Sequence, residues 1–482
     1  MAENSTPLLD RSSPVPAARA SASVLDRGRT VAGPGYNRWL IPPAALAIHL
    51  AIGQAYSFSV FKLPLISLLS HDEKNPAAGD WSAAQVGWIF SIAIMILGLS
   101  AAVFGKWLER VGPRKAMLAS ALCFAGGFFI GSLGVHLHSL FLLYFGYGFV
   151  GGIGLGIGYI SPVSTLIKWF PDRPGVATGM AIMGFGGGAM IASPLELLLM
   201  NHFKTPTDNG VAATFIALGI IYFAFMQLGI WTIRVPAEDW KPAGYVPNAQ
   251  HSALITNNNV LADDAIKTPQ FWLLWVVLLC NVTAGIGILE TASPMVQEIF
   301  SDKTMGPGRG ITVAAAGGFV GLLSLFNLLG RFFWSSLSDK LGRKPIYLLY
   351  FGLGVLLYAL LPTLGRNHSL ALFVAACCVI LSMYGGGFAT MPAFLSDMFG
   401  KKQVGAIHGR VLTAWSTAGV LGPLLVNYLH DKTKSGAEAY QPVFYAMAGL
   451  LVIGFLADSA ITAVNARYND PHPELSVADA GH

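Results

Sequence analysis

The chain has 482 residues, of which 54% are hydrophobic and 11% charged, whereas a soluble protein carries about 25% charged residues. So few charged residues cannot form the surface of a water-soluble protein of this length, so a soluble protein is excluded. Four cysteines are too few for a disulfide-rich secreted scaffold, and all lie in apolar stretches: Cys123, Cys280, Cys377 and Cys378. The net charge of +5 follows membrane topology, described below, so we expect no nucleic-acid partner.

Long apolar runs follow one another along the chain. A helix needs about 20 apolar residues to cross the hydrocarbon core of a bilayer, and barrel strands would be shorter and alternate in polarity. The sequence therefore predicts an all-α polytopic membrane protein in contact with the lipid bilayer. Twelve transmembrane helices are expected at 39–69, 84–107, 114–135, 138–168, 175–200, 211–234, 270–300, 312–338, 345–365, 369–398, 404–429 and 441–466.

Polar segments divide these runs into two groups of six. Residues 1–38 are rich in Ser, Pro, Ala and Arg, and we expect a disordered cytoplasmic tail there. Residues 235–269 are expected to form a cytoplasmic linker between bundles at 39–234 and 270–466, and residues 467–482 a second tail. Lys and Arg concentrate in the loops on the side of the two termini. This bias predicts that both termini are cytoplasmic, in the cell membrane, or the inner membrane of a Gram-negative bacterium.

An internal repeat relates the two halves at an offset of 230 residues. Its clearest pairs are Glu109 with Asp339 and Gly112 with Gly342; the others are Pro64 with Pro294, Pro162 with Pro392, Gly175 with Gly405 and Gly179 with Gly409. Each pair falls at the same place in equivalent predicted helices. The register therefore predicts two pseudo-symmetric six-helix bundles in the same membrane orientation, with a substrate site between them.

Two loops carry the same charged motif. The first holds Gly105, Glu109, Arg110 and Gly112, and the second has Ser335, Asp339, Lys340, Gly342 and Arg343 at the equivalent places. An acid at a helix end, a tight glycine turn and a basic cluster predict a charged latch between helices. Both loops resemble the G-x-x-x-D-R-x-G-R-R/K loop of the major facilitator superfamily, with Glu109 for its Asp and Ser335 for its first Gly. The resemblance implies the major facilitator fold and rocker-switch alternating access.

Several further segments resemble the oxalate/formate antiporter family within that superfamily. They are Arg38-Trp-Leu-Ile-Pro-Pro, Gly53-Gln54-Ala-Tyr56-Ser-Phe58, Gly158-Tyr159-Ile-Ser-Pro162, Lys168-Trp-Phe-Pro-Asp172-Arg173-Pro-Gly175, Asn327-x-x-Gly330-Arg331 and Tyr384-Gly-Gly-Gly-Phe388. The resemblance covers the membrane region and implies a carrier of small carboxylates such as oxalate, formate or pyruvate-like acids.

Two arginines lie inside predicted membrane helices, where a charge is costly. Arg331 stands eight residues before Asp339 and Arg410 eight after Lys402, so each is about 12 Å from its loop. A guanidinium suits a carboxylate, and the family resemblance implies an Arg in helix eight and a Lys in helix eleven as substrate ligands. Arg331 and Arg410 are therefore candidate ligands. In the alternative interpretation Arg331 braces the nearby loop and Arg410 extends to the inner surface.

Other polar groups in the predicted helices complete the candidate site. Glu290 is the most deeply placed acid and a candidate for proton coupling, or else a hydrogen-bonded structural carboxyl. Three further titratable residues are weaker candidates for a functional role than Glu290: Glu196, His49 and His408. On helices that line the central cavity in this superfamily, four polar-tipped residues are candidates for substrate binding or helix packing: Gln54, Tyr56, Tyr159 and Tyr384.

No nucleophile–base pair, zinc spacing or nucleotide-binding motif is present in the sequence, so we expect neither an enzyme nor a metal or cofactor site. The sequence predicts a secondary transporter of small organic anions that works as an exchanger or proton symporter and as a monomer. Two alternatives remain open. One is a facilitator that exports neutral or cationic compounds, which would need an acidic cavity, and the other is a non-transporting membrane sensor.

Overall fold

The computed structural model describes residues 23–70, 77–205, 207–237, 240–245, 254–256, 258–431 and 437–471. In the first half the helices are α1 (Arg27–Thr30), η1 (Arg38–Leu40), α2 (Ile41–Ile52), η2 (Gly53–Phe61), α3 (Lys62–Ile66), α4 (Ala83–Val111), α5 (Pro113–His136), α6 (Leu140–Leu143), η3 (Tyr144–Gly151), α7 (Gly152–Trp169), α8 (Pro174–Phe203) and α9 (Val211–Thr232). In the second half they are α10 (Ala262–Ala265), α11 (Pro269–Ile299), α12 (Asp302–Met305), α13 (Val313–Leu341), α14 (Arg343–Arg366), α15 (Leu370–Phe399), α16 (Val404–Val411), α17 (Thr413–Asp431), α18 (Ala437–Ser459) and η4 (Ala466–Tyr468).

Eleven helical segments of the described residues are long and apolar enough to cross a membrane. They coincide with eleven of the predicted runs. The remaining run, 404–429, forms α16 and α17, which are separated at Leu412. Large apolar side chains are exposed on the outside of the helices, for example Val103 at 71% and Phe141 at 72%. Such a surface suits hydrocarbon rather than water.

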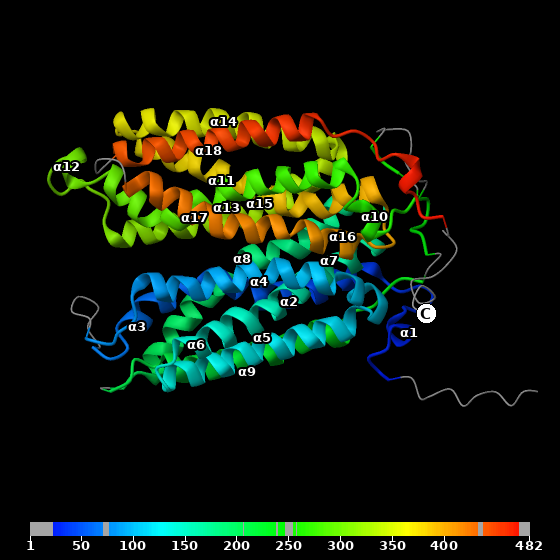
Figure 1. The fold of residues 1–482 in the computed structure, drawn as a ribbon, viewed down its shortest axis with the longest axis horizontal. Helices are drawn as coiled ribbons and strands as arrows, with labels where there is room; N and C mark the ends of the chain where they lie inside the picture. Colours follow the sequence, from blue (N-terminus) through cyan, green and yellow to red (C-terminus); the bar gives the residue numbers. More distant parts are fainter. Residues whose placement is uncertain are drawn as a thin grey trace, which may run out of the picture.

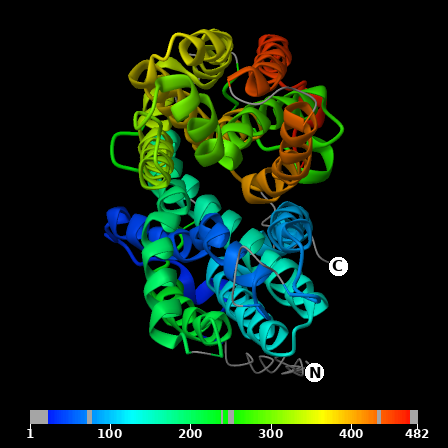
Figure 2. The same ribbon diagram turned by 90° about the vertical axis from the view of Figure 1, so that its left-hand side faces the viewer.

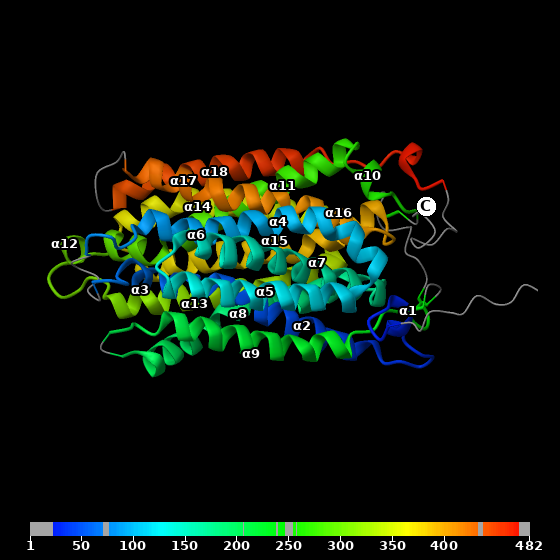
Figure 3. The same cartoon turned by 60° about the horizontal axis from the view of Figure 1, so that its bottom comes forward.

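The two halves of the chain form two helical bundles (Figures 1 and 2). Each bound of α13 lies 230 residues after the corresponding bound of α4, and the same holds for α14 and α5, which matches the predicted register. The bundles meet along two seams. In one seam α8 packs on α13 and α15, and in the other α4 packs on α16 and α17, as Figure 3 shows for α4 and α16.

The helix ends follow from local sequence. Ser82 accepts a hydrogen bond from the Gln85 backbone, and the Gln85 side chain accepts one from the Ser82 backbone, which begins α4 with a capping box. The α4–α5 and α13–α14 pairs turn at Gly112 (φ +87°) and Gly342 (φ +91°). Only glycine adopts this backbone conformation without strain, which accounts for the glycine at the same place in both loops.

The segment before the first spanning helix differs from the prediction. Residues 23–38 are not a disordered tail: Val24 accepts a hydrogen bond from Arg114 at 2.7 Å, and Asp26 pairs with Lys115. Val31 forms a β-bridge with Val235, just after α9. The basic start of α5 and the end of α9 thus satisfy polar groups of a segment that has little apolar surface to bury. Residues 1–22 of the predicted tail lie outside the described residues.

The predicted linker 235–269 is also partly described. It contains the short helix α10, and Val260 donates a backbone hydrogen bond to Phe399 at the end of α15 (2.9 Å). In Figure 1, α1 and α10 lie at the same end of the molecule, and α12 lies at the opposite end. We call the end that holds α1 and α10 the terminal end.

Candidate functional site

Arg331 is completely buried in α13, at the seam between the bundles. Its Nε donates to Asn327 Oδ1 at 3.0 Å, and its Nη1 donates across the seam to the Ile182 carbonyl of α8 at 3.3 Å. Its Nη2 has no hydrogen-bond partner among the described residues. A buried guanidinium with an unsatisfied donor is costly, so this atom is available to a ligand.

Close approach of Arg331 to its neighbours requires glycine at two positions. A Cβ on Gly186 would lie 2.8 Å from Arg331 Nε, and a Cβ on Gly385 would lie 2.6 Å from Asn327 Oδ1. Both distances are too short for non-bonded atoms. The glycines of α8 and α15 therefore leave the space that the guanidinium and its Asn327 partner occupy.

Aromatic side chains from both bundles surround the guanidinium. Its carbon lies 5.3 Å from the ring centroid of Phe388 and 5.9 Å from that of Phe185, within the range of cation–π attraction. The Trp415 ring centroid lies 4.6 Å from that of Phe388 and 5.4 Å from that of Phe185. These rings exclude water while leaving one charged group at the centre.

All three tyrosines proposed from the sequence join this group. The hydroxyls of Tyr56 and Tyr384, one from each bundle, lie 3.3 Å apart. Tyr159 packs on Phe185 and Trp415, and its buried hydroxyl has no hydrogen-bond partner within the described ranges. All three interact electrostatically with the guanidinium. We call the whole set the Arg331 cluster: Arg331, Tyr56, Tyr159, Phe185, Tyr384, Phe388 and Trp415.

Two other candidate residues, Gln54 and Arg410, are not brought to the cluster. Gln54 points into the first bundle, where its amide donates to Glu196 at 2.8 Å. Arg410 binds the Ala262 carbonyl and pairs with Asp263 of α10 at 2.6 Å. Hydrogen bonds from Lys106 and Arg410 lower the pKa of Asp263. The side chain of Glu290 lies outside the described residues.

Four residues around the Arg331 guanidinium were not among the site residues predicted from the sequence: Phe185, Phe388, Trp415 and Asn327. Asn327 had a usable signal, because a residue four positions before Arg331 lies on the same helix face. Phe388 closes the family-like segment Tyr384-Gly-Gly-Gly-Phe388. Phe185 and Trp415 had no such signal, since aromatic side chains are frequent throughout the predicted helices.

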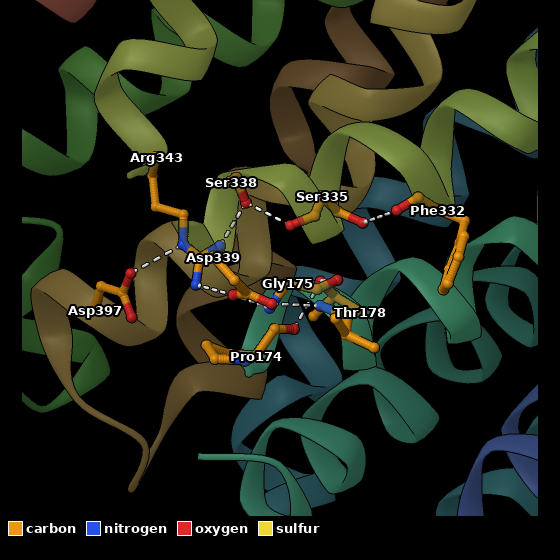
Figure 4. A network of polar contacts seen from close by, with 10 residues as sticks. Pro174, Gly175, Thr178, Phe332, Ser335, Ser338, Asp339, Arg343 and Asp397 are labelled. Carbon is orange, nitrogen blue, oxygen red and sulfur yellow. Dashed lines mark hydrogen bonds and ion pairs between the residues drawn. The ribbon is translucent and has the colours of Figure 1, made fainter. Parts of the chain in front are cut away.

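A second polar network closes the terminal end of the α8–α13 seam (Figure 4). Asp339 at the end of α13 accepts hydrogen bonds from the backbone N–H groups of Gly175 and Val176, both at 2.8 Å. These groups begin α8 in the other bundle, where a helix N-terminus favours negative charge. Arg343 links Asp339 at 2.6 Å and Asp397 at 3.0 Å. We call this network the α13 latch.

The first bundle makes the equivalent contact with the second. Glu109 at the end of α4 accepts a hydrogen bond from the Gly405 N–H at the start of α16 (3.1 Å), as well as from Ser164 and Lys168. We call this network the α4 latch. Gly105 also lies at this seam, because a Cβ added at this position would lie only 2.6 Å from the Ala406 Cα.

The basic residues of the two loops have different positions. Arg110 and Lys340 are exposed, whereas Arg343 is buried in the α13 latch. Arg114, two residues after Gly112 in the first turn of α5, instead donates to the carbonyls of Val24 and Ile230. Both acids and Gly105 thus lie at the contacts between the bundles, whereas Gly112 and Gly342 face Arg27 and Pro345 of their own bundles.

Comparison with known proteins agrees with this architecture. The family model described as Major Facilitator Superfamily matches residues 35–308 and 299–479. The chain is 27% identical over 388 residues to the oxalate:formate antiporter of Oxalobacter formigenes, covering 80% of this chain and 83% of that protein. It is 25% identical over 368 residues to apicoplast pyruvate carrier 1 of Toxoplasma gondii, covering 67% and 65%.

A solved structure with the same fold is that of the fucose:proton symporter of Escherichia coli. It superposes with a TM-score of 0.65 at 12% identity, covering 88% of this chain and 99% of the symporter. At this identity the likeness shows the fold alone. The paired bundles, the repeated loop and the family match together establish a multi-pass membrane protein. The chain belongs to the Major Facilitator Superfamily.

Proposed function

We propose that the protein is a secondary transporter of small organic anions and that Arg331 binds the carboxylate of the substrate. The observation that carries this proposal is the buried guanidinium, whose Nη2 has no hydrogen-bond partner among the described residues. None of the ion pairs between described residues includes Arg331. A carboxylate would supply both the countercharge and a two-oxygen acceptor that matches the guanidinium fork.

The cluster favours a monocarboxylate. It holds one guanidinium, because Arg410 is paired with Asp263 at the terminal end. The hydroxyls of Tyr56, Tyr159 and Tyr384 would orient the remaining polar atoms of a small acid, and the rings of Phe185, Phe388 and Trp415 would pack on its apolar part. Relatives named as an oxalate:formate antiporter and a pyruvate carrier support formate and pyruvate-like acids as the first substrates to test, with oxalate as the dicarboxylate comparison.

Transport would proceed by alternating access. We propose that the terminal end is cytoplasmic, in accordance with the distribution of Lys and Arg. Both latches are then closed on the cytoplasmic side in this conformation. Rocking of the bundles would break the contacts of Asp339 and Glu109 with the opposite helix starts. Because the cluster draws residues from both bundles, that motion would also take it apart and release the substrate.

Uptake into proteoliposomes tests the assignment. Purified protein would be reconstituted and assayed with labelled formate, pyruvate, lactate and oxalate. Arg331→Gln should abolish uptake, and Arg331→Lys should retain little, because an ammonium cannot form the planar two-donor contact. Arg366→Gln, which removes an exposed arginine at the end of α14, is the matched control and should transport normally.

Thermal unfolding separates ligand binding from folding. A substrate that binds only the folded state raises the apparent melting temperature, so pyruvate should stabilise the wild type and Arg366→Gln. The same addition should leave Arg331→Gln unchanged. Normal transport by Arg331→Gln, or a failure of that variant to fold, would remove the ligand role and favour a bracing role for Arg331.

A further inference from the structure

A buried titratable carboxyl group lies in the first bundle, away from the Arg331 cluster. Glu196 in α8 has no exposed surface. Its Oε1 accepts hydrogen bonds from Gln54 Nε2 at 2.8 Å and from Ser57 Oγ at 2.6 Å. Its Oε2 has no hydrogen-bond partner among the described residues. Glu196 lies fourteen residues after Ile182, the α8 contact of Arg331, which is about 21 Å along a helix.

The groups that face Glu196 are neutral. Gln54 and Ser57 belong to η2, and neither carries a charge. The titratable groups close enough to interact with it are the phenols of Tyr147 from η3 and Tyr222 from α9. Tyr147 donates to Gln54 Oε1 at 3.1 Å, and the buried Tyr222 hydroxyl has no partner in the part of the chain that the structure describes.

Charged and titratable groups on the other elements packed against α8 are engaged elsewhere. On α2, His49 contacts the carbonyls of Ala181 and Tyr159. On α13, Arg331 contacts Ile182. Tyr159 of α7 and Tyr384 of α15 belong to the Arg331 cluster, and Lys62 at the start of α3 is exposed. No ion pair between described residues includes Glu196.

This environment suits a protonated carboxyl. An ionised carboxylate buried among neutral donors is costly, whereas the acid form needs only one oxygen as acceptor. Gln54 donates to Oε1, which fits the carbonyl oxygen of the acid form, and the single hydrogen of the Ser57 hydroxyl lies within reach of both Oε1 (2.6 Å) and the Gln54 backbone carbonyl (2.7 Å). Oε2, which has no partner among the described residues, is then the oxygen that carries the proton. A change of conformation that admitted water to Oε2 would allow that proton to leave.

Irregular helix connects Glu196 to the substrate site. Gln54, Tyr56 and Ser57 all lie in η2, a 3-10 segment in the middle of the first spanning helix. Gln54 and Ser57 hold Glu196, while Tyr56 reaches Tyr384 and packs on Phe185 at a centroid distance of 4.9 Å. Tyr147 lies in η3, a π-helix. Mid-helix 3-10 and π segments often mark functional hinges. A shift of η2 would therefore move both the hydrogen-bond partners of Glu196 and the Tyr56 side chain in the Arg331 cluster.

We propose that Glu196 is a proton-binding site in the first bundle and that η2 couples its protonation to anion binding at the Arg331 cluster. This inference rests on the proposed transport of a carboxylate. One proton binds at Oε2 from water on one side of the membrane and dissociates to water on the other. One monocarboxylate crosses with it, so that the O–H bond formed on entry is broken on exit and no net charge moves.

Two assays on the same proteoliposomes test the proposal, with pyruvate as the probe. Exchange of labelled for unlabelled pyruvate at equal pH on both sides reports carboxylate transport alone. Accumulation driven by a pH gradient, recorded together with a trapped pH-sensitive dye, reports coupled proton movement. The wild type should be active in both assays, and collapse of the gradient with a protonophore should remove accumulation.

Glu196→Gln replaces the protonated acid by a neutral side chain of the same shape. It should lose gradient-driven accumulation and the dye signal, while exchange remains measurable. Glu196→Asp keeps an ionisable group and should retain both signals. The matched control is Glu298→Gln, since Glu298 is a partly exposed acid near the end of α11 that contacts His430 and Tyr440; it should also retain both.

The outcomes separate the two proposals. Wild-type exchange without any response to the pH gradient, or proton movement that persists in Glu196→Gln, overturns the proton site and leaves the transport proposal standing. No exchange by the wild type with any of the four acids overturns the transport proposal itself. Ser57→Ala is the second variant that tests the role of Glu196 if Glu196→Gln fails to fold. Because it removes one of the two donors to Oε1, it should shift the pH of half-maximal uptake, and an unmoved profile contradicts the role of Glu196.

Discussion

At the scale of single residues, Arg38 and Asp172 show how the Trp-Phe-Pro-Asp-Arg segment is held. The guanidinium of Arg38 contacts both carboxylate oxygens of Asp172, at 2.6 and 2.9 Å, and lies over the ring of Phe170 at 4.6 Å. Burial opposes ionisation of Asp172, but the hydrogen bonds and charge of Arg38, a backbone hydrogen bond and the hydrogen bond from Arg173 together lower the pKa of Asp172. The pair ties the start of the first spanning helix to the α7–α8 loop.

Asp172→Asn should lower thermal stability in detergent, by about 2 kcal/mol if both charge-assisted bonds are lost. Because the folded pKa is below the unfolded value, the stabilisation is present above the unfolded pKa and is lost as the pH falls through the folded pKa. The difference in melting temperature between wild type and variant should be constant near neutral pH and should shrink below about pH 4. A difference that is independent of pH would contradict the ionic role of Asp172.

The two arginines show what residue spacing can and cannot predict. Counting residues from the loops gave the depth of Arg331 and Arg410, because the rise along a helix is fixed. It did not give the direction of either side chain around its helix. Arg331 lies in the uninterrupted α13, whereas Arg410 lies in the eight-residue helix α16 and points to α10, a helix that the sequence did not indicate. Depth alone therefore could not distinguish a cluster residue from a residue that pairs at the terminal end.

At the scale of elements, regular helices were predictable from apolar length, and irregular ones were not. The bounds of α4, α5 and α8 lie within a few residues of the predicted runs. The 3-10 and π segments η2 and η3 lie within longer apolar runs and contain no proline that would interrupt a helix, so the predicted runs continued through them. Gln54 and Tyr56 are two residues apart, and side chains at that spacing do not face the same side of a helix. Although they were assigned to one cavity from the sequence, Gln54 therefore reaches Glu196 and Tyr56 reaches Tyr384.

Close helix contact at the α4–α16 seam gives a prediction about conformation. A Cβ on Gly409 would lie 2.2 Å from the Ala101 carbonyl oxygen of the other bundle. Gly409→Ala should therefore destabilise this closed conformation by about 1–3 kcal/mol and open the terminal end. Ser164 is a buried donor to Glu109 within the α4 latch; with Ser164→Cys present in every background compared, its reaction with a bulky maleimide would measure the opening.

Gly317→Ala is the control for that experiment, because a Cβ on Gly317 meets no atom within 4 Å. It should leave the labelling rate of Ser164→Cys unchanged. Equal labelling rates in the Gly409→Ala and Gly317→Ala backgrounds would mean that the seam tolerates a methyl group and does not hold the terminal end closed.

At the scale of the whole molecule, the two latches form a pseudo-symmetric pair. Asp339 contacts the start of α8, and Glu109 contacts the start of α16, each across the boundary between the bundles. The latches differ in their local partners. Asp339 is held by Arg343 of the same loop, whereas Glu109 is held by Lys168 and Ser164 of the neighbouring helix. The sequence indicated the acids and glycines of this arrangement but not which helix each acid would contact.

Neutralising the latches should shift the balance between conformations. Asp339→Asn and Glu109→Gln each weaken a charge-assisted contact with a helix start, worth about 0.3–1 kcal/mol at an exposed site and up to about 2 when partly buried. Spin labels at the exposed Arg110 and Lys340 should report a larger population at long distance in each variant. The double variant should show the largest shift.

Asp208→Asn, in the loop between α8 and α9 at the end opposite the latches, provides the comparison, because Asp208 contacts Gly210 within its own loop. Distance distributions that are the same for this variant and for the double latch variant would contradict a role of the latches in closing the terminal end.

The linker after α9 has a consequence for how the gene could be divided. Thr256 and Val260 donate backbone hydrogen bonds to Asp397 and Phe399 at the end of α15, and Asn259 accepts one from Asp470. The second part of the linker is therefore built into the second bundle, whereas Val235 pairs with Thr30 of the first. Two polypeptides produced by a break between residues 245 and 254 would each keep their own terminal contacts. Co-expressed, they should reassemble and copurify, whereas a break directly after Val260 would place Thr256, Asn259 and Val260 on the first polypeptide, away from the second bundle that they contact, and should reduce the yield.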